Sequence, residues 1–377
     1  MRTGVSTVTR KPFRLGSRKT PPKVIIQTLG SVYDLDHRVL GMSARARTRS
    51  PTSERLRFSK DEVSQVTDLQ IRKMRFGFED HDVPFLWNED NPAFSSMANA
   101  ISFLAVGFEK MIVQMITQAK PLITDPEVAS EADAFMRQEG QHSTAHRQHV
   151  KALIDRYPGL QETLDEVIGA FDKLTAETSL HYRLAYTADL EATFTPVFKL
   201  MLDHDSTLFA PGGDDRVASL FIWHFVEEVE HRSSALIIFD SIVGSDLYRM
   251  RMAPSVFRHV LKVIEIASEG FNRHVPVEDR KIDAMAMFAR YRRKQALRKV
   301  IPTLTAEYNG PMTRAFDDLP LGEQLTALAG VVRSQMPRHN PEHEKLPALA
   351  GLWFDRFEAG YDVTHWYTAG ANAQGDS

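Results

Sequence analysis

Beyond the first 60 residues, hydrophobic positions recur every three or four residues, which is the period of an α-helix. No alternating strand pattern, glycine-rich phosphate loop or nucleophile elbow interrupts this period. The sequence therefore predicts an all-α protein. The predicted helices cover 61–76 with Ser59 as its cap, 95–120, 127–157, 160–174, 176–203, 216–243, one or two helices within 246–308, 321–336 and 348–361.

Proline residues set several of the predicted boundaries. Pro121 and Pro158 each follow a long helical segment and should end it. Pro196 lies inside the segment 176–203 and should kink it, because proline removes one helical hydrogen bond. Pro254 and Pro276 should interrupt the helical segments that follow residue 245.

Three polar residues interrupt the apolar stripe of the segment 216–243. His224, Glu228 and His231 lie at i, i+4 and i+7, on the same helix face as Leu220 and Ala235. Burying two imidazoles and a carboxylate is costly unless something compensates them, and a bound cation is the simplest compensation. The alternative is a solvated surface helix, which suits the neighbouring Glu227 and Glu230 better than Glu228.

The same chemistry recurs elsewhere in the chain. An E-x-x-H pair is expected by chance about once in a chain of this composition, but an H-x-x-x-E-x-x-H only about 0.03 times. A second E-x-x-H, Glu139 to His142, lies in another helical segment. A lone glutamate precedes each pair on a further helix, Glu109 and Glu191, and each shares its face with apolar residues.

These residues fit a di-metal centre in a four-helix bundle. Such centres take one Glu from each of two helices and Glu-x-x-His from each of the other two. Four carboxylates also neutralise two divalent cations. Two alternatives stay open, because Glu109 could form a buried salt bridge with Lys110 or an arginine, and Asp189 lies close to Glu191 in sequence.

Other histidines are assigned more distant roles. His224 is either a third imidazole ligand or a donor that orients a ligand. His146 and His149, which follow His142 on the same helix, are expected behind the ligands rather than among them. His339 and His343 lie in a proline-interrupted segment and are expected at the surface.

The motifs resemble known families. The helical pattern resembles the ferritin-like di-iron superfamily, and His224 resembles the third histidine of di-iron arylamine N-oxygenases. A bacterial family labelled predicted metal-dependent hydrolases is similar from about Ile71 to Asp240, through Gln138-Glu139-x-x-His142-x-x-x-His146 and Trp223-His224-x-x-Glu227-Glu228-x-Glu230-His231. The resemblance implies a ferritin-like four-helix bundle with extra C-terminal helices.

Charge and composition divide the chain. The net charge is −3, yet residues 1–60 carry 14 Lys/Arg against three acidic residues. This segment is expected to be a largely disordered basic arm, followed by the di-metal bundle over 61–245 and by additional helices and a flexible tail over 246–377. The arm is either a solvated tail or a segment that touches phosphate or a membrane surface.

Compartment and partners follow from what the sequence lacks. With no cysteine, disulfides, thiolate nucleophiles and Cys-ligated metals are excluded. The arm has no secretory core, and the apolar stretch 101–116 is too short to span a bilayer, so we expect a cytoplasmic protein without an integral membrane segment. We expect no nucleic acid partner, a small-molecule substrate and either a monomer or a homodimer.

The sequence leaves three functions open. The main hypothesis is a non-haem di-iron oxygenase that uses two iron ions, O₂ as co-substrate and an electron-donor protein, because a mixed carboxylate and imidazole set suits iron. The alternatives are a di-metal hydrolase and a ferritin-like protein that binds metal without turnover. Eight apolar residues could line a pocket for an apolar or aromatic substrate or be ordinary core: Phe103, Phe108, Met111, Met115, Phe194, Phe198, Phe221 and Phe225.

Overall fold

The computed structural model describes residues 69–79, 82–209, 213–300 and 309–368. Within these ranges every regular element is helical, so the protein is all-α, as predicted. The basic arm predicted over residues 1–60 lies outside the described residues.

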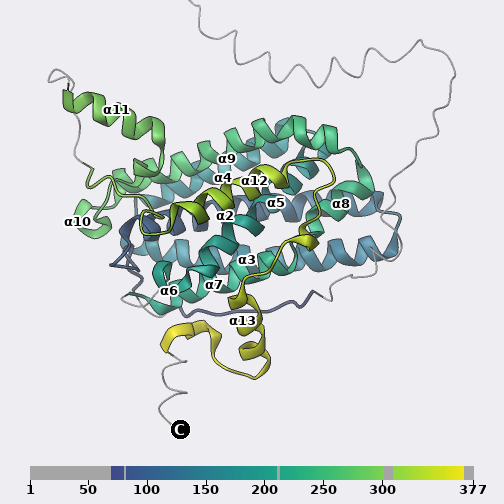
Figure 1. Ribbon diagram of the computed structural model, residues 1–377, viewed down its shortest axis with the longest axis horizontal. Coiled ribbons are helices and arrows are strands. Elements are labelled where there is room, and N and C mark those ends of the chain that lie inside the picture. Colours follow the sequence, from purple (N-terminus) through teal and green to yellow (C-terminus); the bar gives the residue numbers. More distant parts are fainter. Residues whose placement is uncertain (1–68, 80–81, 210–212, 301–308, 369–377) are drawn as a thin grey trace, which may run out of the picture. The chain divides into compact units, whose positions relative to one another are not determined.

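Four long helices enclose the centre of the molecule (Figure 1). They are α2 (Pro92–Ala119), α3 (Pro126–Arg156), α5 (Leu180–Asp203) and α7 (Asp215–Glu230). α2 and α7 each pack against both α3 and α5, so the four helices close around one interior. This arrangement is consistent with the predicted four-helix bundle.

Further helices cover the outside of these four. α4 (Leu160–Glu177) and α9 (Asp246–His274) pack against each other and against α2, and α9 also packs against α5. α12 (Leu321–Ser334) packs on α5, and α13 (Ala348–Glu358) packs on α5 and α7. The shorter elements are α6 (Asp205–Leu208), α8 (Ser234–Ile242), α10 (Val277–Arg280), α11 (Ala289–Val300) and the 3₁₀ turns Lys120–Leu122, Ala284–Met287, Pro341–His343 and Val363–His365.

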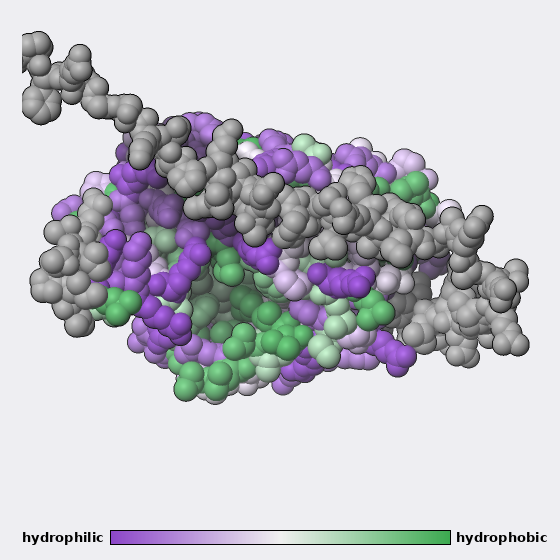
Figure 2. Space-filling model, turned by 90° about the horizontal axis from the view of Figure 1, so that it is seen from above, coloured by the Kyte–Doolittle hydropathy of each residue, from purple (hydrophilic) through white to green (hydrophobic). Residues whose placement is uncertain are grey.

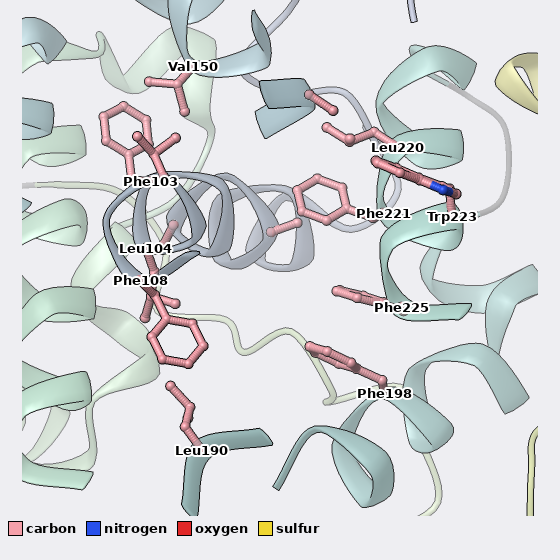
Figure 3. Packing of buried hydrophobic residues seen from close by; sticks show 14 of the residues in the cluster. Phe103, Leu104, Phe108, Val150, Leu190, Phe198, Leu220, Phe221, Trp223 and Phe225 are labelled. Carbon is pink, nitrogen blue, oxygen red and sulfur yellow. The ribbon is translucent and has the colours of Figure 1, made fainter. Parts of the chain in front are cut away.

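Aromatic residues fill the space between the helices. Phe198 of α5 stacks on Phe225 of α7 with ring centroids 3.9 Å apart, and Phe221 lies one turn away (Figure 3). Seven of the eight residues that were expected to line either a pocket or the core belong to the buried core, and Phe194 is partly buried against it. They stabilise the protein by removing apolar area from water.

Side-chain caps explain where the long helices begin. Asn91, Asp125, Ser179 and Asp214 each accept a hydrogen bond from a backbone N–H in the first turn of the helix that follows. α2 therefore begins at Pro92, earlier than the serine predicted to open it. The cap at Ser179 also separates α5 from α4.

Three details of the predicted secondary structure are wrong. Residues 69–76 have no regular secondary structure and are not helical, because this segment lies against other parts of the molecule instead of forming its own helical turn. The helix predicted over 216–243 is two helices, since the chain bends between His231 and Ser234. Pro254 lies inside the continuous helix α9 and does not interrupt it, because packing on neighbouring helices outweighs one lost hydrogen bond. Pro196 lies inside α5, and the kink expected there stays a prediction.

One face of the molecule carries an apolar region. Figure 2 shows a face on which hydrophobic residues gather around a hollow bordered by hydrophilic ones. Among the described residues, the stretch Pro92–Leu122 is long and apolar enough to cross a membrane, yet 72% of its apolar 18-residue window is buried inside the protein. A buried core helix meets the same criterion.

Candidate metal centre

The structure brings all seven predicted ligands together in the interior. α2 supplies Glu109, α5 supplies Glu191, and the remaining five come from α3 and from α7 with its C-terminal cap. Each of the seven is at most 3% exposed to solvent: Glu109, Glu139, His142, Glu191, His224, Glu228 and His231. Residues separated by up to 122 positions in the sequence thus share one buried site.

The seven residues form two adjacent groups. In each group one potential ligand atom per residue lies within 4.8 Å of all the others. The first group is Glu109, His142 and His224, and the second is Glu139, Glu191, Glu228 and His231. The first has two imidazoles to one carboxylate, whereas the second has three carboxylates to one imidazole.

Glu228, which belongs to the second group, also lies close to both histidines of the first group. Its Oε1 is 2.9 Å from Nε2 of His224 and 3.4 Å from Nδ1 of His142. Its Oε2 is 3.1 Å from Nε2 of His231. The two oxygens of one carboxylate therefore point to different groups, which is the geometry of a bridging ligand.

Several atoms of the site have no hydrogen-bond partner. Among the described residues these buried atoms include both carboxylate oxygens of Glu139 and Glu191, Oε2 of Glu109 and Nδ1 of His142. Leaving a buried polar atom unsatisfied costs about 1–3 kcal/mol. Two metal ions would satisfy them, so the residues present fit such ions.

The electrostatics of the carboxylates support this fit. Burial raises the pKa of Glu109 and of Glu191 well above its ordinary range, with repulsion from Glu139 and Glu228 respectively adding to it. Burial and the charge of Glu228 raise the pKa of Glu139 to about 7. Without cations, protons therefore stand on carboxylates that metal ions would otherwise neutralise.

The imidazoles differ according to their neighbours. Burial by itself lowers the pKa of His142, but the hydrogen bond to Glu227 and the nearby carboxylate of Glu228 outweigh it and raise this pKa to about 10. Burial and repulsion from His142 lower the pKa of His224 to about 4. His142 therefore holds a proton that His224 lacks when no metal is present.

Glu227 belongs to neither group but forms a hydrogen bond with one of the potential ligands. The expectation that Glu227 is solvated is therefore wrong. It is fully buried, and its Oε2 accepts a hydrogen bond from Nε2 of His142 at 2.9 Å. Gln138 has the same relation to His231, since its Oε1 accepts from Nδ1 at 3.0 Å. The other nitrogen of each ring, Nδ1 of His142 and Nε2 of His231, therefore faces Glu228.

A chain of polar side chains leads away from His224. Nδ1 of His224 lies 2.7 Å from Nε2 of His146, whose Nδ1 lies 2.9 Å from the hydroxyl of Ser102. The same hydroxyl is 2.9 Å from Nδ1 of His149. His146 and His149 belong to neither group of potential ligands, as the sequence suggested; that they serve the ligands stays a prediction.

The structure also resolves the alternatives that the sequence left open. Lys110 pairs with Asp172, so it does not neutralise Glu109. Oδ1 of Asp189 forms an ion pair with Nη1 of Arg249 at 3.1 Å, and Asp189 belongs to neither group of potential ligands. Neither His339 nor His343 belongs to a potential metal group among the described residues; the second is exposed, while the first is partly buried.

Arg72 also contacts the site, and no sequence motif indicates it. It lies in the irregular segment before the bundle, is 5% exposed, and donates hydrogen bonds to Glu227 and Glu230. Burial by itself lowers its pKa, but the hydrogen bonds and charges of those glutamates raise it above the ordinary value. No periodicity signals this contact, because 155 positions separate Arg72 from Glu227.

Comparison with known families places this geometry in context. The profile of a family described as "Predicted metal-dependent hydrolase" matches residues 70–316, which include the whole site. The chain belongs to this family. No curated protein and no solved structure is similar enough to count as a match. Membership in the metal-dependent hydrolase family and the buried donor groups together indicate a metal-dependent enzyme.

Proposed function

We propose that this member of the metal-dependent hydrolase family is a hydrolase with a dinuclear metal centre. The observation that carries the proposal is the convergence of seven buried donors, several of whose atoms have no hydrogen-bond partner. One ion would be held by Glu109, His142 and His224, the other by Glu139, Glu191 and His231, and Glu228 would bridge them. The four carboxylates would balance two divalent cations.

When bound, the two ions would supply Lewis acidity for hydrolysis or, if they are iron, redox chemistry with O₂. The chain's own residues set the conditions for either reaction. Glu228 would fix the separation of the two positions, and Glu227 keeps a proton on Nε2 of His142. His146, next to His224, is placed to exchange a proton with it.

A specific observation favours a second candidate, a non-haem di-iron oxygenase. α2 and α5 each carry a lone Glu, while α3 and the end of α7 each carry Glu-x-x-His. This is the ligand pattern of ferritin-like di-iron carboxylate proteins. Under this hypothesis two iron ions and O₂ are required, and an electron-donor protein supplies reducing equivalents to oxidise a small apolar or aromatic substrate.

The remaining properties are proposals of the same kind. Both candidates act on a small molecule, and neither needs a nucleic acid. A cytoplasmic location is proposed from the composition of the chain, and a homodimer is proposed as the assembly, which the molar mass in solution tests. The third hypothesis is a protein that binds metal without catalysing a reaction, and the experiment must distinguish both candidate enzymes from it.

Zinc distinguishes the candidates because it has no redox chemistry. Zinc-loaded protein is mixed, without O₂, with p-nitrophenyl esters, phosphodiesters and anilides, and a Glu228→Ala variant serves as the control. We expect hydrolysis of at least one class by the zinc form and its loss in the variant. If zinc protein is inert while the ferrous form consumes O₂ in the presence of an apolar substrate, the oxygenase replaces the hydrolase. If neither form turns over, both candidates are wrong.

A further inference from the structure

Arg72, which lies outside the bundle helices, contacts two glutamates, and hydrogen bonds link each glutamate to a different imidazole of the site. Arg72 lies in the irregular segment before α2. Its Nη1 donates to Oε1 of Glu227 at 2.9 Å and to Oε2 of Glu230 at 2.8 Å, while Nη2 donates to Oε1 of Glu230 at 2.9 Å. The guanidinium thus grips Glu230 with two nitrogens and also reaches Glu227.

The first branch leads to His142. Glu227 accepts from Arg72 with one oxygen and from Nε2 of His142 with the other. Because both oxygens are engaged, the carboxylate cannot rotate without breaking a hydrogen bond to a charged group. The imidazole is held with Nδ1 toward Glu228, which lies 3.4 Å away.

The second branch leads to His231. Glu230 accepts from Arg72 and also from Nε2 of Gln138 at 2.8 Å. The Gln138 amide nitrogen donates in addition to the backbone carbonyl of Gln70 at 3.0 Å. With its nitrogen directed to two acceptors, the amide must present Oε1 to His231, and the imidazole is held with Nε2 toward the second group.

The C-terminal helix α13 closes the remaining side of the guanidinium. The Arg72 carbon Cζ lies 4.8 Å from the ring centroid of Phe354, 5.8 Å from Trp353 and 5.5 Å from Phe357. These rings keep the guanidinium at its carboxylates and exclude water from it. α13 lies beyond the matched family region, so this cover is a feature of this chain's C-terminal part.

We propose that Arg72 is a shared positioning residue, which orients His142 through Glu227 and His231 through Glu230 and Gln138, so that it tunes both metal positions at once. The proposal rests on the dinuclear function above. It requires the forked shape of a guanidinium and not only its charge, because three hydrogen bonds run to two carboxylates. Lysine retains the charge but lacks the fork.

The test therefore compares Arg72→Lys with the unchanged protein. Zinc affinity at each position is measured by chelator competition, and the visible spectrum of the cobalt-loaded protein reports ligand geometry. Arg183→Lys is the matched control, since Arg183 is also 5% exposed but donates to Gln118 and to the carbonyl of Thr175. Thermal unfolding of the metal-free proteins measures any purely structural loss.

We expect Arg72→Lys to bind two zinc ions with both affinities lowered about 10–100-fold, the usual effect of losing an outer partner of a ligand. Its cobalt spectrum should change, and that of Arg183→Lys should not. If Arg72→Lys binds zinc with unchanged affinities and loses only thermal stability, Arg72 forms a structural ion pair and does not position the ligands. A loss at one position alone would overturn the shared role.

Failure of the dinuclear function gives a different result. The unchanged protein would then bind fewer than two zinc ions, whatever residue stands at position 72. A Glu230→Gln variant separates the branches, because it removes one acceptor of the His231 branch and leaves the Glu227 contact in place. Under the proposal it weakens the second position more than the first, and an equal or reversed effect contradicts the two-branch arrangement.

Discussion

Glu227 and Glu228 are adjacent in the sequence, and their carboxylates approach opposite nitrogens of the same imidazole. Oε2 of Glu227 lies 2.9 Å from Nε2 of His142, while Oε1 of Glu228 lies 3.4 Å from its Nδ1. One carboxylate is thus placed to hold the ring and the other to share a metal ion with it. Two chemically identical neighbours have different roles because the helix turns them about 100° apart.

This difference predicts unequal effects of the same substitution. Glu228→Gln should abolish binding of two ions, because the bridging charge between the groups is lost. Glu227→Gln should still bind two ions, with affinity at the His142 position about 10–100-fold lower. Metal content after dialysis, together with chelator competition, measures both. Equal loss in the two variants would show that the assigned roles are wrong.

The two groups should prefer different metals. Carboxylate oxygens suit manganese, whereas imidazoles suit zinc, and divalent manganese is the weaker binder of the first-row series. Manganese should therefore load one ion per chain, in the group that contains Glu139, Glu191 and His231, at concentrations at which zinc loads two. Paramagnetic resonance counts the bound manganese. His231→Ala should remove this ion and His224→Ala should spare it; the reverse pattern contradicts the assignment of the groups.

His224 and His146 offer a matched pair of imidazoles, one inside the first group and one behind it. His224→Ala should lower the bound zinc from two ions to one, because the first group keeps only Glu109 and His142 besides the bridge. His146→Ala should retain two ions with weaker binding, since it removes only a partner of His224. Two ions at full affinity in His224→Ala would mean that His224 is not a ligand.

Stability of the metal-free protein should fall as pH rises from about 7 to about 9. Burial raises the pKa of Glu109 and Glu191 well above that of an unfolded carboxyl. The hydrogen bond to Glu227 and the nearby carboxylate of Glu228 overcome burial and raise the pKa of His142 to about 10. The folded chain then binds more protons than the unfolded chain, so the free energy of unfolding decreases with pH. The lowered pKa of His224, about 4, acts only below the ordinary imidazole pKa.

Denaturant unfolding of chelator-treated and zinc-loaded protein measures this effect at both pH values. Bound ions take the place of the protons, so the zinc form should lose less stability than the metal-free form over the same interval. Metal binding should release protons, which calorimetry in buffers of different ionisation enthalpy detects. A metal-free protein as stable at about pH 9 as at about pH 7 would contradict the prediction.

The sequence was sufficient to predict the helical fold and the members of the two groups. Periodicity reveals them because Glu109, Glu191 and Glu228 stand where an apolar residue is expected, and such a departure is visible in one helix at a time. The break at His231 was not predictable, since the apolar stripe continues through it into α8. Whether these residues bind metal stays a prediction.

The residues that form hydrogen bonds with the potential ligands, or with the partners of those ligands, could not be predicted in the same way. Glu227 and Glu230 have the spacing of a solvated helix face, and only the tertiary structure sets Arg72 against them. That contact joins an irregular segment to the end of α7, so no local sequence pattern indicates it. The fold of residues 69–76 was mispredicted for the same reason, because contacts with distant residues outweigh the local helical pattern.

Anomalous diffraction from crystals of the zinc-loaded protein tests the central claim most directly. We expect two peaks per chain. One should lie about 2.1 Å from nitrogens of His142 and His224 and the other at this distance from His231, with Glu228 contacting both. A single peak, or two peaks not joined by Glu228, would contradict the dinuclear centre.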